Sequence, residues 1–193
     1  IRRGDQVITL SGERREGQPL GLGFAHPTFD IDVRRCNNLC GFCFVLQMAP
    51  RMRRSLYIKD DDYRYSFLFG QYVTLTNLSE HDQWRIVEQH LSPLYVSVHA
   101  TDLDLRRQCL RNPDAPDILE QLAWLTDEGI EIHTQVVVTP GLNDGSHLEK
   151  SVRDLVDYYP GVQSVSIVPV GLTRHHKYTM RPNNRAESEI VLD

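Results

Sequence analysis

Two hydrophobic periods alternate along the chain from residue 72 onward, and together they predict a repeat of strands and helices. Short runs rich in β-branched and aromatic residues favour strands. Stretches with apolar residues three and four positions apart favour amphipathic helices. Strands are predicted over 72–77, 94–99, 130–138 and 162–170, and helices over 79–91, 114–129 and 148–159.

Caps and breakers indicate where several of these elements begin and end. Ser79 followed by Asp82 resembles a capping box that opens a helix. Pro116 falls in the first turn of the helix predicted over 114–129. Earlier in the chain, the aspartates at 60–62 favour the start of another helix, which Gly70 would end.

Strands that alternate with helices at this spacing form βα units, in which parallel strands are joined by right-handed crossovers. A further strand is predicted over 29–35, which makes five. Five strands are fewer than the eight of a closed barrel. We therefore expect an α/β fold, a partial (β/α) barrel with an open, mostly parallel sheet. Chemistry in such sheets collects at the carboxyl ends of the strands.

Three of the four cysteines lie within eight residues, directly after the first predicted strand of this repeat. Cys36, Cys40 and Cys43 form the pattern CxxxCxxC, with Phe42 before the last cysteine. Thiols this close in sequence can turn their sulfurs onto one centre, as iron-sulfur clusters require. A structural zinc site is an alternative, with Cys109 or a histidine as fourth ligand. Inert or redox-active thiols are the other alternative.

Composition narrows the class of protein. The 193 residues, 40% hydrophobic and 24% charged, suit one globular domain with a sizeable core. The net charge of -5 gives no strong nucleic-acid or membrane-surface signal. No apolar run is long enough to span a membrane, and no signal peptide is visible. Because clustered free thiols persist in reducing compartments, we expect a cytoplasmic protein.

A local basic cluster follows Pro50. Arg51, Arg53 and Arg54 stand close together there. A solvated turn is the simpler interpretation, and a clamp for an anion or carboxylate near the cysteines is the alternative.

The cysteine pattern resembles the signature of the radical S-adenosylmethionine (SAM) enzymes. In that family three cysteines hold a 4Fe-4S cluster, and its remaining iron binds the amino and carboxylate groups of SAM. Reduction of the cluster cleaves SAM to a 5'-deoxyadenosyl radical, which abstracts a hydrogen atom from the substrate. The run over 94–155, which includes Gln-x-Val-Val-x-Pro-Gly-Leu-Asn-Asp at 135–144, resembles the second half of a radical SAM core.

Four stretches narrow the resemblance to the DUF512 family: CNNxCxFCF at 36–44, LYxKDDDYR at 56–64, TLTNL at 74–78 and SPLYVSVHAT at 92–101. Members of that family are described as iron-sulfur oxidoreductases with a PDZ-like domain before the core and the DUF512 region after it. The resemblance implies a linker or the tail of a PDZ-like domain over 1–23 and a radical SAM-like core over 24–180. Residues 181–193 would begin a truncated DUF512 region. We therefore expect a fragment of a longer protein, or a processed one.

The sequence departs from the family at one motif. Radical SAM enzymes usually carry a Gly-Gly-Glu-like motif at the end of the strand after the cluster loop, where backbone groups hold the amino group of SAM. No Gly-Gly occurs here, and segment 55–70 stands where that strand is expected. Either residues 60–62 or the Thr76–Asn77 end takes its place, or SAM binding is weakened or lost.

The resemblance also implies contacts to SAM. Phe42 would lie near the adenine, with core packing as the alternative. Ser97, His99 and Gln135 are polar residues on apolar strands, where ribose and carboxylate contacts fall in the family. Ser97 and His99 should share one side, because side chains alternate along a strand. A satisfied buried hydrogen bond is the alternative for each. Asn77 is a similar candidate, with a turn or helix entry as the alternative.

Two functions from different classes follow. The first is an enzyme that cleaves SAM reductively at a 4Fe-4S cluster and abstracts hydrogen from an unknown substrate, such as a protein or RNA. Its electron donor would be a ferredoxin or flavodoxin. The second is a non-catalytic module that uses a cluster or zinc for structure, redox sensing or partner binding. The missing Gly-Gly-Glu favours the second function, and the polar strand-end residues favour the first.

Overall fold

The computed structural model describes residues 2–3, 6–9, 11–13, 16–17 and 32–192. The chain divides into two compact units, Ile1–Ile31 and Asp32–Asp193. In the first unit, β1 (Arg2–Arg3) pairs antiparallel with β2 (Gln6–Val7). The beginning of the strand predicted over 29–35 lies outside the described residues.

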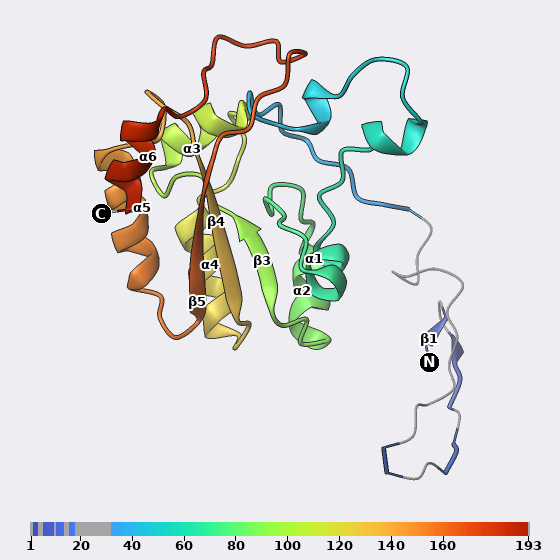
Figure 1. The fold of residues 1–193 in the computed structure, drawn as a ribbon. Helices are drawn as coiled ribbons and strands as arrows, with labels where there is room; N and C mark the ends of the chain where they lie inside the picture. Colours follow the sequence, from blue (N-terminus) through green and yellow to red (C-terminus); the bar gives the residue numbers. More distant parts are fainter. Residues whose placement is uncertain (1, 4–5, 10, 14–15, 18–31, 193) are drawn as a thin grey trace. The chain divides into compact units, whose positions relative to one another are not determined.

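A parallel sheet forms the centre of the second unit. Its order is β3 (Leu94–Ser97), β4 (Ile132–Val138) and β5 (Val162–Pro169), with β4 in the middle. Figure 1 shows these three strands side by side and pointing the same way. The predicted α/β class with an open parallel sheet is therefore confirmed.

Two of the predicted strands do not form as strands, and each contributes a single isolated β-bridge in its described residues. Val73 bridges Val96 in parallel, and its N–H donates to Tyr95 O at 3.0 Å, so segment 72–77 follows the outer edge of β3. This segment does not continue as a strand because Leu75 has a φ of 59°, a left-handed conformation that interrupts a ladder. In the described part of 29–35, only Arg35 forms a bridge, antiparallel to Asp60.

Helices fill the connections of the second unit. The described residues contain two short 3-10 helices, η1 (Val45–Gln47) and η2 (Arg54–Tyr57). The α-helices are α1 (Tyr63–Phe69), α2 (Glu80–Glu88), α3 (Leu103–Leu110), α4 (Ile118–Asp127), α5 (Ser146–Val156) and α6 (Arg185–Leu192). None of the described helices is long and apolar enough to cross a membrane.

The helix caps explain these bounds. Gly70 ends α1 with a φ of 70°, and Ser79 and Asp82 form the predicted capping box of α2. The start of α4 differs from the prediction. The Asp117 side chain accepts a hydrogen bond from Leu119 N at 2.8 Å and caps the helix there, so Pro116 precedes α4 instead of lying in its first turn.

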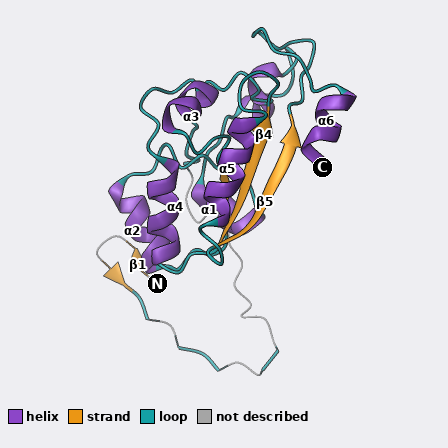
Figure 2. Cartoon of the chain, turned by 90° about the vertical axis from the view of Figure 1, so that its left-hand side faces the viewer, coloured by secondary structure: helices purple, strands orange, loops and turns teal. Residues whose placement is uncertain are grey.

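One face of the sheet is covered by helices and forms the main core. Leu94, Val96 and Ile132 of the sheet pack with Leu122 of α4 and Leu155 of α5, all at most 1% exposed. Figure 2 shows α4 and α5 on one side of β4 and β5. Along the other face runs a polar row, because Ser97 is in register with Gln135 and Gln135 with Ser166.

Candidate metal centre

The cysteine loop, residues 36–43, lies at the carboxyl end of the sheet. The Phe42 ring meets the ring of His99, two residues after β3, with centroids 4.7 Å apart. The Gln47 side chain, just beyond the loop, donates to the backbone oxygen of Gly171, two residues after β5, at 3.4 Å. Chemistry collects at this edge of parallel α/β sheets.

The three thiols of the loop are neighbours. Cys40 is buried, and Cys36 and Cys43 are half-buried. Burial and the charges of Cys36 and Cys43 together raise the pKa of Cys40 to about 12, so both thiols lie within electrostatic reach of Cys40. Burial also raises the pKa of Cys36, as does the nearby Asp61 carboxylate. The protein alone therefore holds Cys36 and Cys40 as neutral thiols, and a bound metal would displace their protons.

The loop as it lies is not a ready-made site for a single metal ion. In the described part of the chain, no three His, Cys, Asp or Glu side chains meet closely enough to hold a single metal ion. Zinc–sulfur bonds of about 2.3 Å would bring the sulfurs within about 4 Å of one another. A cluster spreads its cysteines over several irons, so it accepts neighbouring thiols that do not touch.

Asn38 anchors the loop from inside. Its side chain is 1% exposed, and its Nδ2 donates to Cys36 Sγ at 3.3 Å, to Thr74 Oγ1 at 2.8 Å and to Thr76 Oγ1 at 2.9 Å. Its Oδ1 accepts from Asn112 Nδ2 at 2.8 Å. The loop is thereby tied to segment 72–77 and to the end of α3. The residue pattern does not predict this role, although Asn38 stands within the resemblance at 36–44.

Three ionisable groups lie behind the loop. Lys59 Nζ donates to the backbone oxygen of Asn38 and lowers the pKa values of Cys36 and Cys40. Burial raises the pKa of Asp61, while its hydrogen bonds from Thr74 N at 2.6 Å and Thr74 Oγ1 at 2.5 Å oppose the rise.

Arg106 of α3 is the third ionisable group, and it is fully buried. It donates to Thr74 O at 2.8 Å, but its Nε and Nη1 have no partner. Burial lowers its pKa to about 10, and the Asp61 and Cys40 charges oppose that shift. Apolar spacing along 103–110 gives no sign of this buried cation.

Of the predicted SAM-contacting residues, Phe42 and His99 come together. Burial lowers the pKa of His99 to about 3, and its Nδ1 accepts from Val137 N at 3.3 Å. The strand alternation from which a shared side for Ser97 and His99 was predicted does not reach His99, because β3 ends at Ser97 and His99 has a φ of 64°. Ser97 lies beside Gln135 on the polar row of the sheet.

The Asn77 side chain forms hydrogen bonds with the backbone near the cysteine loop. Its Nδ2 donates to Arg35 O at 3.1 Å and to Asp61 O at 2.9 Å, while its buried Oδ1 has no partner. Segment 55–70 falls where the Gly-Gly-Glu strand is expected in the sequence, but it does not form that strand. It contains η2 and α1, and the chain returns to the sheet edge only over 72–77. The Thr76–Asn77 end is therefore the segment that follows the cysteine loop along the sheet.

A cavity of about 710 Å³ opens beside the cysteine loop. Gly41 of the loop, Arg111 after α3, Thr139 and Pro140 after β4, and Met180 are among its lining residues. The Thr139 hydroxyl is buried without a partner. A Cβ at Gly41 would meet Met180 Sδ at 2.7 Å, so the flexible Met180 side chain would have to shift.

The sequence model of a family described as "Radical SAM-like domain" matches residues 14–165. The chain belongs to the radical SAM-like family. Among solved structures, SuiB of Streptococcus suis aligns with a TM-score of 0.55 at 13% identity, over 83% of this chain and 44% of that chain. A radical SAM methyltransferase from Sphaerobacter thermophilus aligns with a TM-score of 0.41 at 19% identity, over 62% of this chain and 35% of that chain.

This radical SAM-like chain thus spans less than half the length of either solved structure. The likeness to SuiB concerns the fold alone. No curated protein matches the chain. The narrower resemblance to DUF512 stays a prediction, as do the PDZ-like and DUF512 boundaries. Membership of the family implies an iron-sulfur cluster and SAM, and the cysteine loop is the place where the described residues offer three thiols together.

Proposed function

We propose that this chain is a radical SAM core that cleaves SAM reductively at a 4Fe-4S cluster and abstracts hydrogen from a substrate still to be identified. One observation carries the proposal. Cys36, Cys40 and Cys43 lie as neighbours at the carboxyl end of the sheet, in a chain whose family implies a cluster.

These three thiolates would hold the cluster. When bound, a 4Fe-4S cluster supplies the electron that cleaves SAM and so yields the 5'-deoxyadenosyl radical. Two N–H groups of Asn38 point at Cys36 Sγ, from the backbone at 3.5 Å and from Nδ2 at 3.3 Å. Such hydrogen bonds withdraw charge from a ligating sulfur and help to set the reduction potential.

The cavity beside Gly41 supports the SAM part of the proposal. Its volume of about 710 Å³ lies within the usual range for small-molecule sites. Arg111, which lines the cavity and whose guanidinium lies 4.2 Å from the centre of the Tyr178 ring, offers a cation for a carboxylate. Phe42 and His99 would contribute from the neighbouring side of the loop.

A specific observation favours the second function, a non-catalytic iron-sulfur or zinc module. The strand end that follows the cysteine loop is closed by side chains of the loop itself. Thr76 Oγ1 donates to Asn37 Oδ1 at 2.6 Å, and Asn38 holds both Thr74 and Thr76. Without a Gly-Gly pair, fewer backbone groups are free there for the amino group of SAM.

Anaerobic reconstitution followed by reduction with SAM separates the two functions. We expect the wild-type chain to bind iron and sulfide and to release 5'-deoxyadenosine, measured by chromatography with mass detection. The Cys40→Ala variant should release none. An intact cluster that yields no 5'-deoxyadenosine would favour the non-catalytic module. Zinc in place of iron after anaerobic purification would contradict the cluster itself.

A further inference from the structure

Arg106 is a buried cation whose hydrogen-bonding capacity is almost unused. Its side chain is 0% exposed, and Nη2 donates to the backbone oxygen of Thr74 at 2.8 Å. The Nε and Nη1 atoms of Arg106 are buried and have no hydrogen-bond partner. A buried charge is costly unless opposite charges and hydrogen bonds compensate it. The described residues therefore compensate the positive charge of Arg106 only in part.

The guanidinium stays charged at neutral pH in spite of its burial. Burial lowers the pKa of Arg106 only to about 10, which is still far above pH 7. The groups whose charges oppose that shift are the carboxylates of Asp61 and Asp117 and the thiols of Cys40 and Cys109, with Asp61 the strongest. All of these groups are negative when ionised. The position therefore favours an anion.

Asp61 balances this cation incompletely, because both of its carboxylate oxygens bind elsewhere. Its Oδ1 accepts from Thr74 N at 2.6 Å and its Oδ2 accepts from Thr74 Oγ1 at 2.5 Å. Both oxygens thus act as acceptors, as in an ionised carboxylate. Neither of them accepts from the guanidinium of Arg106. Asp61 therefore offsets the charge through space and leaves two of the three guanidinium nitrogens without a partner.

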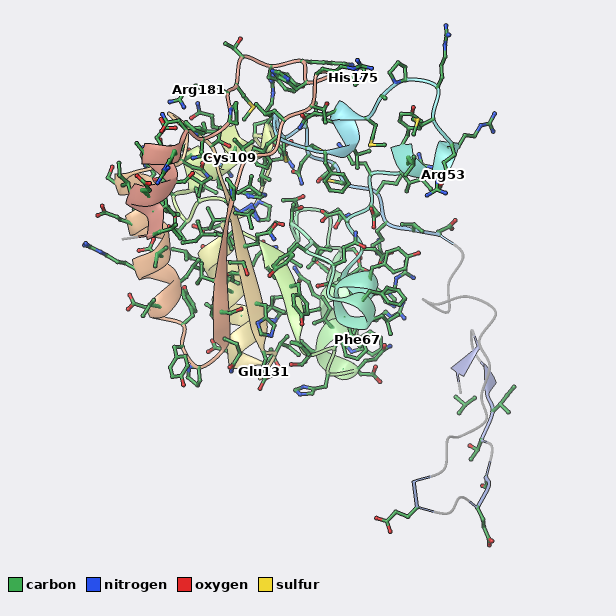
Figure 3. All side chains as sticks on the ribbon, viewed as in Figure 1. Arg53, Phe67, Cys109, Glu131, His175 and Arg181 are labelled. Atoms are coloured by element: carbon green, nitrogen blue, oxygen red, sulfur yellow. The ribbon has the colours of Figure 1, made fainter. Side chains whose placement is uncertain are left out.

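The face of α3 that carries Arg106 also contacts the cysteine loop. Leu110 is one turn further along α3, so the two residues share a face of the helix. Leu110 packs in one apolar cluster with Cys40, and its backbone oxygen accepts a hydrogen bond from the loop. Figure 3 shows Cys109, also of α3, at the end of the unit away from Glu131. The guanidinium is close enough to Cys40 for their charges to interact.

A chain of hydrogen bonds also joins Arg106 to the loop. Thr74 accepts from Arg106 through its backbone oxygen, and its hydroxyl accepts from Asn38 Nδ2 at 2.8 Å. Asn38 Nδ2 in turn lies 3.3 Å from Cys36 Sγ. The position of the buried charge relative to the cysteines is thereby fixed through segment 72–77 as well as through α3.

We infer that Arg106 balances part of the negative charge of the cluster and so favours its reduced state. This inference rests on the proposed function, because it needs a cluster on the three loop thiolates. Three thiolates make the oxidised cluster and its ligands negative overall, and reduction adds one electron without forming or breaking a bond. A fixed positive charge in the interior lowers the energy of the more negative state. Arg106 acts from behind Cys40, so it is a positioning residue.

Potentiometric titration of the reconstituted cluster tests the inference. Dithionite is the electron donor, and the absorbance of the cluster reports its reduction. Arg106→Met removes the charge and keeps a long side chain, whereas Arg106→Lys keeps the charge. The matched control is Arg153→Met, which makes the same change in net charge at an exposed position of α5. Urea unfolding of each cluster-free variant checks that it folds.

We expect Arg106→Met to lower the equilibrium constant for reduction at least about tenfold, which corresponds to about 59 mV in the midpoint potential for one electron. Arg106→Lys should restore most of the wild-type value. The control should match the wild type, because its charge is exposed and screened. An unchanged potential in Arg106→Met would overturn the inference, as would an equal shift in Arg153→Met or an equal loss in Arg106→Lys.

Asp61→Asn separates an effect of charge from a loss of structure. Removing this carboxylate should raise the equilibrium constant for reduction, whereas a loosened site would shift it in the same direction as Arg106→Met. The double variant, Arg106→Met with Asp61→Asn, does not leave Asp61 without its cation, so it serves if Arg106→Met fails to fold. Its equilibrium constant should lie about tenfold below that of Asp61→Asn. Equal values for these two variants would overturn the inference.

The titration needs neither SAM nor a substrate, which keeps its result separate from the proposed function. A wild type that binds no iron would overturn both proposals. Equal potentials in the wild type and Arg106→Met would overturn the inference alone, even when 5'-deoxyadenosine is formed. The expected shift in a protein that forms no 5'-deoxyadenosine would support the inference and count against the enzyme.

Discussion

The two sides of the second unit are held together by different interactions. Between the sheet and α4 and α5, the contacts are apolar, as between Ile132 and Leu122, which are fully buried. Around the cysteine loop, a small apolar cluster that includes Cys40 and Leu110 is accompanied by buried polar groups: Asn38, Asp61 and Arg106. The apolar side depends on close packing, so a removed side chain leaves a cavity. The polar side depends on individual hydrogen bonds, so each lost partner leaves another group unsatisfied.

The largest expected effect is a loss of stability at low pH. It is caused by His99, which lies between the apolar side and the polar side. The pKa of His99 is about 3 in the fold and about 6.5 in the unfolded chain, so the unfolded chain binds more protons between these values. The free energy of unfolding should therefore fall as the pH falls from 6.5 to 3, by at most about 5 kcal/mol at 1.36 kcal/mol per pKa unit.

This is measured by urea unfolding of the cluster-free chain between pH 7 and pH 4. The His99→Gln variant removes the titrating group, so its stability should depend less steeply on pH than that of the wild type. Identical pH dependence in the two proteins would mean that His99 is not buried in its neutral form.

A cavity in the apolar side should come next. Leu122→Ala removes a fully buried side chain from the core between α4 and the sheet. We expect a loss of about 3 kcal/mol in the free energy of unfolding, measured by urea titration. The folded variant should still take up the wild-type amount of iron, because Leu122 belongs to the other side of the unit. A loss of iron at full folding would show that the two sides are coupled.

Asn38 anchors the cysteine loop on the polar side. Replacing it should lower the free energy of unfolding less than Leu122→Ala does, but should impair cluster binding more. Asn38→Ala leaves Asn112 Nδ2 without its acceptor and removes one donor from each of the two threonine hydroxyls, which costs about 2 kcal/mol. We expect slower reconstitution and faster loss of iron, followed by absorbance. Asn37→Ala is the matched control, since Asn37 is exposed and water can replace its hydrogen bonds. Equal losses in both variants would contradict the role given to Asn38.

The smallest effect is expected at a helix end far from the loop in sequence. Ser79→Ala removes the hydroxyl that caps α2 and accepts from Asp82 N at 3.3 Å. The expected cost is about 1 kcal/mol, measured by thermal or urea unfolding, with iron uptake unchanged. A cost near zero would mean that the Asp82 half of the capping box suffices.

The sequence predicted the apolar side well and the polar side poorly, for a physical reason. The strands β3, β4 and β5 follow the apolar runs, and the caps of α1 and α2 follow local chemistry. The edge segment over 72–77 has the same β-rich composition, but the left-handed backbone at Leu75 interrupts it. Composition does not reveal such a turn in a non-glycine residue.

For the candidate site, too, the sequence predicted one part and not the other. The cysteine spacing predicted a metal centre at the loop, and that site stays a prediction. The anchoring contacts could not be found from periodicity, because Asn38 reaches Thr74 and Asn112 across 36 and 74 residues of chain. The buried Arg106 was missed for the same reason, since its partner Thr74 lies on another element.

The central claim is that Cys36, Cys40 and Cys43 together hold one cluster, and metal analysis of cysteine variants tests it most directly. After anaerobic reconstitution, the wild type and Cys109→Ala should each contain about four irons and four sulfides per chain. Cys109 is the matched control because it is a buried thiol outside the loop. Replacing any one of the three loop cysteines by alanine should abolish stable binding. Full iron content in one of those three variants, or its loss in Cys109→Ala alone, would contradict the account.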